Sequence, residues 1–309
     1  MKVVFMGTPD FSVPTLEKIV EAGHEVVGVV TQPDKAKGRG KNMAFPPVKE
    51  KALEYGLKVY QPRRAREPEF VEEMKALKPD VMVVVAFGQI LPKAILDIPF
   101  YGCINVHASL LPKYRGAAPI QWAVVSGEKV SGVTTMQMDV GLDTGDMLLK
   151  AEVALDADET GGSLHDKLSV IGGDLLIQTL EGLEKGTLTP EKQDDSQTGE
   201  YARMLDKALG QIDFSKSAEE IERLIRGLNP WPSAYTHYQG KTMKLWRAEV
   251  VPGGDGKPGQ IVEVDKKGFI VQTGEKALRV IELQMEGKKW MDAGAFLRGA
   301  QMLPGDFLE

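Results

Sequence analysis

The chain has 309 residues, of which 42% are hydrophobic and 27% charged, and its formal net charge is −6. These values are typical of an ordinary soluble globular protein that is long enough for two domains. No apolar run approaches the ~20 residues that a membrane-spanning helix needs, so no membrane partner is expected. The negative charge argues against a strongly basic nucleic-acid-binding protein, so any RNA contact has to use local basic patches.

The amino-terminal residues and the cysteine content both favour the cytosol. The chain enters an apolar run and a turn at once, without the hydrophobic segment of a signal peptide or an Arg-rich leader. Its single cysteine, Cys103, cannot form an intramolecular disulfide, which suits a reducing compartment. Cys103 lies inside a strand-like run, and this position favours a small core residue over a nucleophile.

Strand-like and helix-like segments alternate in the first half of the chain. Four segments have the nearly continuous apolar, β-branched composition of strands that are buried on both faces of a parallel sheet. They are residues 2–7, 25–32, 81–91 and 103–107. Between them, apolar residues recur at helical spacing in three segments that end at Gly or Pro, residues 12–23, 46–56 and 68–79. The alternation predicts an α/β fold with a Rossmann-like, mostly parallel, twisted sheet and right-handed crossovers.

Two further strands and a long helix complete the first domain, for which we expect residues 1–186. Residues 132–139 and 146–153 are strand-like and bracket a Gly-rich turn. The amphipathic run 163–183 should cover one face of the sheet. The polar residues 187–206, which include Pro and Gly, are expected to form a linker.

Residues 207–309 are predicted to form a second domain. It opens with a helix at residues 217–227, where Ser217 and Glu220 make a capping box and Gly227 a C-terminal stop. Four short alternating runs follow, divided by Gly and Pro turns, at residues 243–251, 259–264, 268–274 and 277–284. Short strands at this spacing predict a small β-barrel or sandwich, and we expect a barrel of the OB-like kind. From residue 207 onward there are 15 Lys and Arg against 14 Asp and Glu, so this domain is nearly neutral.

The sequence lacks the motifs of several common enzyme classes. The first strand ends with a single glycine instead of G-x-G-x-x-G, which disfavours a nicotinamide enzyme. There is no H-x-x-x-H, C-x-x-C or G-x-x-x-x-G-K-[ST] motif, so we expect neither a metal site nor a P-loop.

Three polar residues remain as candidates for chemistry, namely Asn105, His107 and Asp143. In a strand, the side chains of Asn105 and His107 point to the same face. The loop residues after them place both at the carboxyl end of the strand, where open α/β sheets bind ligands. Asp143 lies in the turn G-L-D-T-G after the next strand, so the three side chains are expected to converge on one crevice.

An amide, an imidazole and a carboxylate suit the transfer of an acyl-like group to an amine without a covalent enzyme intermediate. The amide and the imidazolium can donate hydrogen bonds to the developing oxyanion, at roughly 3 kcal/mol per donor. The carboxylate can stabilise the charged imidazole and take the proton that leaves the amine. A structural interpretation stays open, because a strand-end Asn and His often cap loops and an Asp in a Gly-rich turn often makes an Asx turn.

The segment N-V-H-A-S-L-L-P-K-Y-R-G-A-A-P-I-Q-W-A, residues 105–123, closely resembles the signature of the folate-dependent formyltransferases. The resemblance extends over essentially the whole chain, to the members of this family that act on methionyl-tRNA, through F-M-G-T-P-D-F, V-T-Q-P-D-K-A-K-G-R-G-K-N, V-V-V-A-F-G-Q-I-L-P, D-V-G-L-D-T-G-D-M-L and N-P-W-P-S-A-Y. It implies that Asn105, His107 and Asp143 are the catalytic residues. It also implies 10-formyltetrahydrofolate as the donor and the α-amine of methionine on initiator tRNA as the acceptor, with N-formylmethionyl-tRNA for translation initiation as the product.

The resemblance further implies a site for the folate. The pterin is expected between main-chain segments that carry apolar side chains, with backbone groups at its edge. The implied folate-binding residues are Phe87, Gly88, Ile90, Leu91, Ser109, Leu110, Leu111, Pro112 and Asp139. A buried central strand is the alternative interpretation of the segment around Phe87.

A basic loop is expected to reach towards the acceptor stem of the tRNA. Its implied tRNA-binding residues are Lys35, Lys37, Arg39 and Lys41, and Arg39 is expected to matter most. Flexible cations of this kind bind phosphates with an affinity that falls steeply with salt. In the second domain, five cations are candidate tRNA contacts or an ordinary solvated surface, namely Lys207, Lys241, Lys244, Arg247 and Lys266.

Two other functions stay open from the sequence. A formyltransferase for a sugar-nucleotide amine or glycinamide ribonucleotide would share the chemistry. The glycinamide enzyme should lack the second domain, however, and the sugar-nucleotide enzyme does not need the basic loop. A non-catalytic nucleic-acid-binding protein is disfavoured by the nearly neutral second domain. We expect a monomer in the bacterial cytosol.

Overall fold

The computed structural model describes residues 1–37 and 42–309, and the chain divides into two compact units. The first unit comprises Met1–Pro119, Val130–Ala154 and His165–Ala202. The second unit comprises Ile120–Lys129, Leu155–Leu164 and Arg203–Glu309. No helix of the described chain is both long and apolar enough to cross a bilayer.

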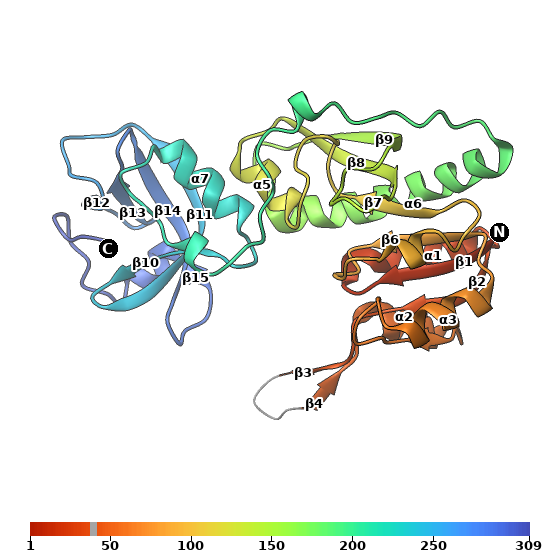
Figure 1. Ribbon diagram of the computed structural model, residues 1–309. Helices are drawn as coiled ribbons and strands as arrows, with labels where there is room; N and C mark the ends of the chain where they lie inside the picture. The colour runs from red at the N-terminus through yellow and green to blue at the C-terminus, as the bar shows by residue number, and fades with distance from the viewer. Residues whose placement is uncertain (38–41) are drawn as a thin grey trace. The chain divides into compact units, whose positions relative to one another are not determined.

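A seven-stranded sheet forms the centre of the first unit (Figure 1). In the order of the sheet, its strands are β5 (Val59–Tyr60), β2 (Glu25–Val30), β1 (Lys2–Gly7), β6 (Val81–Val85), β7 (Cys103–His107), β8 (Val130–Gln137) and β9 (Met147–Ala154). The pairs from β5 to β7 are parallel, and β8 and β9 are added antiparallel at one edge. The predicted Rossmann-like, mostly parallel sheet is therefore confirmed.

Helices pack against this sheet. They are the short η1 (Asp10–Ser12), α1 (Val13–Glu21), α2 (Pro47–Glu54), α3 (Pro68–Leu77), α4 (Lys93–Leu96) and α6 (Gly161–Lys185). Val4 and Met6 alternate along β1 onto one face, where they share a buried cluster with Phe70 of α3 and Ile95 of α4. Side chains two residues apart in a strand point to the same face, so apolar residues at this spacing bury that face of β1.

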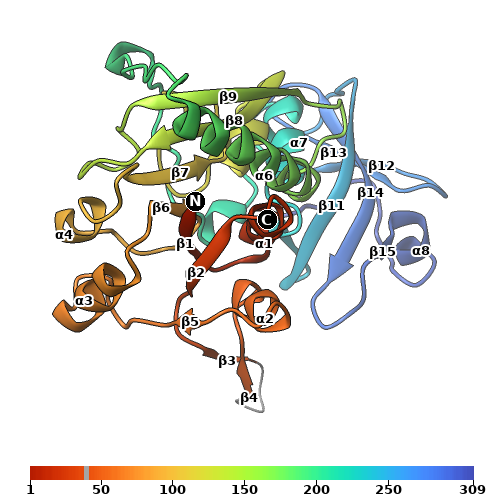
Figure 2. The same ribbon diagram turned by 90° about the vertical axis from the view of Figure 1, so that its right-hand side faces the viewer.

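The long helix α6 lies beside α1 (Figure 2). The Ser169 hydroxyl of α6 donates a 2.8 Å hydrogen bond to the Phe11 carbonyl, just before α1. Gly172 lets the helix approach β7, because a Cβ atom at this position would lie 2.9 Å from Cγ1 of Val106. The predicted helix at residues 163–183 is thus present and extends by two residues at each end.

The second unit is built on an antiparallel sheet. Its strands are β10 (Ala234–Tyr238), β11 (Lys241–Val251), β14 (Ala277–Met285), β13 (Phe269–Gln272) and β12 (Ile261–Val264) in sheet order, with β15 (Met291–Asp292) paired to β14. The helical segments are α5 (Pro119–Val125), η3 (Ala208–Gly210), α7 (Ala218–Gly227) and α8 (Ala293–Leu297). The carboxyl-terminal residues join the two edge strands. The Ile261 amide donates to the Asp306 carbonyl, and the His237 amide donates to the Glu309 carbonyl, both at 2.8 Å.

The capping box predicted for the second unit is present at the start of α7. The Ser217 hydroxyl accepts from the Glu220 amide at 3.2 Å, and the Glu220 carboxylate accepts from the Ser217 amide at 3.0 Å. Ile221 and Ile225 then point into the core of this unit. The cap fixes where the helix begins, and the apolar spacing decides which face it buries.

Three segments differ from the expectation. β6 ends at Val85, because Ala86 and Gly88 have positive φ angles of 46° and 81° that turn the chain out of the sheet. The basic loop has a stem of two short antiparallel strands, β3 (Lys35–Lys37) and β4 (Asn42–Ala44). Arg39 and Lys41 lie outside the described residues.

Residues 187–206, for which a linker is expected, have only one short helical turn, η2 (Asp195–Gln197). Part of this segment is nevertheless tied to the first unit. Met147 of β9 and Glu191 exchange two backbone hydrogen bonds of 2.8 and 2.9 Å, and the Ala202 amide donates to the Arg115 carbonyl at 2.8 Å.

Candidate active site

Strand β7 places Asn105 and His107 on the same face, at the carboxyl end of the sheet. In the register with the neighbouring β8, Asn105 lies opposite Met136 and His107 lies opposite Thr134. His107 is only 7% exposed, whereas Asn105 is half-buried. Within the described chain, no residue makes a hydrogen bond to the Asn105 amide, so this amide is available to a ligand.

Asp143 reaches the same place from the turn between β8 and β9. It adopts φ 54°, which aspartate tolerates better than most residues. One of its oxygens, Oδ2, lies 3.9 Å from Nδ1 of His107 and accepts a 3.0 Å hydrogen bond from the Gly116 amide. The expected convergence of His107 and Asp143 is therefore present in the structure.

The two ring nitrogens of His107 have different surroundings. Nε2 lies 3.0 Å from the carbonyl oxygen of Tyr114, and because a carbonyl only accepts, Nε2 carries the proton of this bond. The 3.9 Å from Nδ1 to Oδ2 of Asp143 is too long for a hydrogen bond, although it brings the carboxylate close to the ring. Within the described chain, Nδ1 is the ring nitrogen left to contact a ligand, while the Tyr114 carbonyl holds Nε2.

Gln193 supports the turn that carries Asp143. Its side-chain nitrogen donates 2.8 Å hydrogen bonds to the carbonyl oxygens of Asp143 and Gly145, and its oxygen accepts from Nε of Arg115 at 2.8 Å. Sequence reasoning missed Gln193 because it lies in the stretch expected to be a linker. No periodicity or spacing in the sequence marks it.

The loop after β7 is held from within the protein. The Ser109 hydroxyl donates to the Lys113 carbonyl at 2.7 Å, and the Thr134 hydroxyl donates to the Ser109 carbonyl at 2.7 Å. Ser109 and Leu111 are each 1% exposed, while Leu110 and Pro112 are half-buried. The side chains of Ser109 and Leu111 therefore shape this loop from beneath, whereas the side chains of Leu110 and Pro112 are partly accessible.

The segment after β6 carries four of the residues that the resemblance assigns to the folate. Phe87 and Leu91 are buried, whereas Ile90 is 82% exposed. The Phe87 carbonyl accepts hydrogen bonds from Thr8 Oγ1 at 3.0 Å and from Gln32 Nε2 at 3.1 Å. Gly88 follows with φ 81°, so this loop offers a ligand its backbone and the Ile90 side chain.

The turn that contains Asp143 also exposes apolar side chains. Val140 is 73% exposed and Leu142 is 56% exposed. Asp139 closes the turn, because its Oδ1 accepts from the Gly141 amide at 2.9 Å and from the Thr144 hydroxyl at 2.8 Å. Exposed apolar side chains on a hydrogen-bonded turn suit contact with a flat ligand.

Cys103 is expected to resist thiol reagents in the folded protein. It is 1% exposed, and burial raises the pKa of its thiol to about 12, with a smaller contribution from the charge of Asp97. Because the thiolate is the reacting species, iodoacetamide at mildly alkaline pH should modify the native protein far more slowly than the urea-unfolded protein. Mass spectrometry would measure both rates, and equal rates would contradict the assignment of Cys103 to the core.

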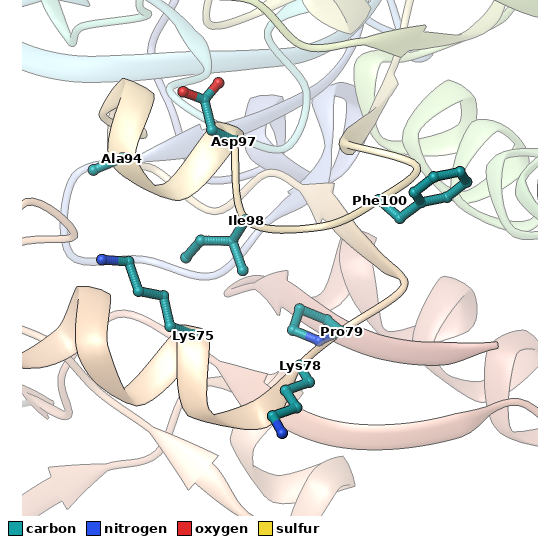
Figure 3. Close-up of a pocket in the computed structure, with 7 residues that line it drawn as sticks. All are labelled: Lys75, Lys78, Pro79, Ala94, Asp97, Ile98 and Phe100. Carbon is teal, nitrogen blue, oxygen red and sulfur yellow. The ribbon is translucent and has the colours of Figure 1, made fainter.

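A separate hollow of about 490 Å³ lies beside α3 and α4 (Figure 3). Its lining includes Pro79, just before β6, and Phe100, just before β7. It therefore lies at the amino-terminal ends of these strands, whereas His107 lies at the carboxyl end. In the part of the chain that the structure describes, no group of three His, Cys, Asp or Glu side chains is placed to hold a metal ion.

Comparison with known proteins decides the family. The formyl transferase family model matches residues 1–180, and the model of the formyl transferase C-terminal domain matches residues 204–301. The chain belongs to the formyl transferase family. It is therefore an enzyme of the formyl-transfer class.

Curated relatives match this formyl transferase chain over its full length. A protein of Lachnospira eligens named methionyl-tRNA formyltransferase is 60% identical over 100% of this chain and 99% of its own. A protein of the same name from Agathobacter rectalis is 58% identical over 99% of each chain.

Solved structures share the fold at lower identity. The N-formyltransferase of Helicobacter canadensis in complex with folinic acid and dTDP-3-aminofucose is 20% identical, with a TM-score of 0.69, over 91% of this chain and 99% of its own. HypX of Aquifex aeolicus in complex with tetrahydrofolic acid is 17% identical, with a TM-score of 0.65. The chain is covered fully in that match and spans 50% of the length of HypX.

Proposed function

We propose that this protein transfers the formyl group of 10-formyltetrahydrofolate to the α-amine of methionine on initiator tRNA. One observation carries the proposal. Asn105, His107 and Asp143 lie at the carboxyl end of the sheet, in a chain that is 60% identical over its full length to a methionyl-tRNA formyltransferase. The direct test is formation of N-formylmethionyl-tRNA from the two substrates by the purified protein, and the absence of product would overturn the proposal.

The reaction needs no covalent enzyme intermediate. The amine nitrogen attacks the formyl carbon of the donor, and the formyl oxygen gains negative charge as the new C–N bond forms. The Asn105 amide and the protonated Nδ1 of His107 donate hydrogen bonds to this oxygen. Asp143 accepts the proton from the amine, directly or through water. Collapse breaks the bond to N10, which takes up the proton held by Asp143, directly or through water, and releases N-formylmethionyl-tRNA and tetrahydrofolate.

The folate is proposed to bind between the loop after β6 and the turn after β8. Both segments present backbone groups together with exposed apolar side chains, among them Ile90 and Leu142. Leu110 and Pro112 border the same site in this proposal. Burying these side chains against the pterin would remove apolar surface from water, which favours binding.

Replacing Ile90 with alanine is expected to weaken folate binding without lowering the stability of the protein. The side chain is 82% exposed in the free protein, so its removal costs little in folding. Its burial against a ligand contributes roughly 1.5–3 kcal/mol, so the Kd for 5-formyltetrahydrofolate should rise by at least about tenfold. Titration calorimetry would measure the Kd, and Val170→Ala, at a half-exposed position on α6, is the control. An unchanged Kd would remove Ile90 from the folate site.

The basic loop is proposed to bind the acceptor end of the tRNA. Its stem, β3 and β4, extends away from the sheet (Figure 1), and Lys35 at the start of the stem is exposed. Lys37, Arg39 and Lys41 complete the set of proposed tRNA-binding cations. Cations on an extended hairpin can follow phosphates without crowding the site at His107.

The second unit is proposed to contact the tRNA as well, with residues 1–186 as the catalytic domain and 207–309 as the tRNA-contacting domain. Four of its five candidate cations have no ion pair within the described chain, namely Lys207, Lys241, Lys244 and Lys266. Arg247 differs, since it lies 3.6 Å from Glu282 and 3.8 Å from Glu249. Lys244 also lies 5.7 Å from the ring of Trp246, which stacks on the exposed Trp290.

This combination of aromatic rings and cations is typical of surfaces that bind RNA. It supports a contact with the tRNA at the stacked pair. For an enzyme that acts on initiator tRNA, we propose the bacterial cytosol as its location and the monomer as its working form.

A further inference from the structure

The basic loop and its stem, β3 and β4, together form a hairpin, here called the basic hairpin. A polar cluster at the base of this hairpin has no part in the mechanism above. It consists of Asp34, Lys49 and Gln61. The Lys49 ammonium group lies 2.9 and 2.7 Å from the two Asp34 oxygens and 2.9 Å from Oε1 of Gln61. Nε2 of Gln61 lies 2.8 Å from Asp34 Oδ1. The side chains of Lys49 and Asp34 are only 14% and 21% exposed, so this pair is shielded from water far better than an ordinary surface ion pair.

The cluster joins the segment that enters the hairpin to the segment that leaves it. Asp34 immediately precedes β3, and Lys49 follows β4 by five residues, in the first turns of α2. The Lys49 ammonium group also lies 3.9 Å from the centre of the Phe45 ring, so its contacts all lie at the hairpin base. Hydrogen bonds from Lys49 and Gln61 lower the pKa of Asp34, so this carboxylate stays charged and keeps its contacts with both residues.

The same network continues to the loop after β6. Nε2 of Gln61 donates to the Gln32 carbonyl at 2.9 Å, and Nε2 of Gln32 donates to the Phe87 carbonyl at 3.1 Å. Thr8 joins it from the end of β1, because its hydroxyl donates to the Phe87 carbonyl at 3.0 Å and accepts from the Gln32 amide at 3.2 Å. The chain of contacts therefore runs without a gap from Asp34 to Phe87.

This connection joins the segments that the proposed function assigns to different substrates. The hairpin is the proposed tRNA contact, and the loop around Phe87 is the proposed folate contact. The residues of the network stand at the carboxyl ends of β1, β2, β5 and β6, so four rigid strands fix their positions. Polar groups of low exposure must all find hydrogen-bonding partners, whereas apolar side chains need none. Apolar side chains would therefore suffice here if the fold needed only stability.

We propose that four residues are positioning residues, namely Asp34, Lys49, Gln61 and Gln32. They hold the tRNA-binding hairpin at a fixed position relative to the folate-binding loop after β6. The inference rests on the proposed function. Lys49 and Asp34 fix the position of the hairpin base, and Gln32 fixes the position of the Phe87 carbonyl. Gln61 links these two parts of the network. The amine of the acceptor and the formyl group of the donor are thereby presented to each other at a fixed separation.

The three kinds of residue predict three different kinetic results. Lys49→Met should raise the KM for methionyl initiator tRNA about tenfold and leave the KM for 10-formyltetrahydrofolate within about twofold of the original value. Gln32→Leu should have the opposite pattern. Gln61→Leu should raise both KM values, and Lys49→Arg, which keeps the charge, should recover most of the loss.

Lys51 supplies a matched control on the same helix. It pairs with Glu17 at 3.1 Å and Glu54 at 2.7 Å, outside the network, so Lys51→Met should leave both KM values unchanged. If the cluster were merely structural, Lys49→Met would lower Tm without separating the two KM values. Equal effects of Lys49→Met and Gln32→Leu on both substrates would overturn the proposal.

A second measurement keeps the inference testable apart from the proposed acceptor. Hydrogen exchange of residues 42–46 in the free protein should speed up in Lys49→Met and in Gln61→Leu but not in Lys51→Met. In Gln61→Leu, the Kd for 5-formyltetrahydrofolate should also rise. If wild-type protein fails to formylate methionyl-tRNA, the proposed function falls, whereas unchanged exchange and an unchanged Kd would remove the link itself.

Discussion

Replacing His107 with alanine is expected to lower the turnover number of formyl transfer by about 100-fold or more. In the proposed mechanism the imidazole donates a hydrogen bond that forms fully only as the formyl oxygen becomes negative, so loss of this bond should appear in kcat and much less in KM. Asn105→Ala removes the second donor and should have an effect of similar size. Single-turnover measurements with preformed enzyme–tRNA complex would isolate the chemical step.

The fold should survive these substitutions. The Asn105 side chain makes no hydrogen bond within the described chain, and the one hydrogen bond of the His107 ring there is with the Tyr114 carbonyl. Circular dichroism and Tm would verify this point. A further variant, Gln193→Leu, touches Asp143 only through the backbone of its turn and should reduce kcat less than loss of His107. Turnover of His107→Ala close to the wild-type value would refute the assigned mechanism.

The second large effect is expected for the basic hairpin. Arg39→Ala should raise the KM for methionyl initiator tRNA by at least about tenfold while the KM for 10-formyltetrahydrofolate stays the same. A cation that neutralises one phosphate also contributes roughly one unit to the slope of log affinity against log salt. The slope should therefore become shallower in the variant, in filter-binding experiments over a range of KCl concentrations.

A control at a distant cation separates this effect from a general loss of positive charge. Lys185, at the end of α6, is paired with Glu181 at 3.3 Å, and Lys185→Ala should change neither the KM nor the salt slope. If Arg39→Ala weakened binding with an unchanged slope, the residue would act through something other than a phosphate contact. If it left the affinity intact, the hairpin would not be the tRNA contact.

Local patterns in the sequence predict much of the fold. The alternation of apolar and β-branched runs with amphipathic ones predicts the Rossmann-like sheet, because each run must bury one or both of its faces. Ser217 and Glu220 predict the start of α7, because the capping box satisfies backbone groups within three residues. The shared orientation of Asn105 and His107 follows from the period of a strand.

Contacts between distant segments could not be predicted in this way. The carbonyl of Tyr114 holds His107 and the side chain of Gln193 holds the turn of Asp143, yet neither contact leaves a periodic mark in the sequence. The ion pair between Lys49 and Asp34 depends likewise on where two separate strands end. The end of β6 at Val85 was missed because composition does not report the positive φ angles that follow it.

Formylation of methionyl initiator tRNA is the activity that we propose for this enzyme. The most direct test offers 10-formyltetrahydrofolate with four acceptors in parallel, namely methionyl initiator tRNA, methionyl elongator tRNA, free methionine and an amino-sugar nucleotide. We expect rapid product formation on the initiator tRNA alone. Product on the amino-sugar nucleotide alone would keep the chemistry at His107 and Asp143 but contradict the proposed acceptor.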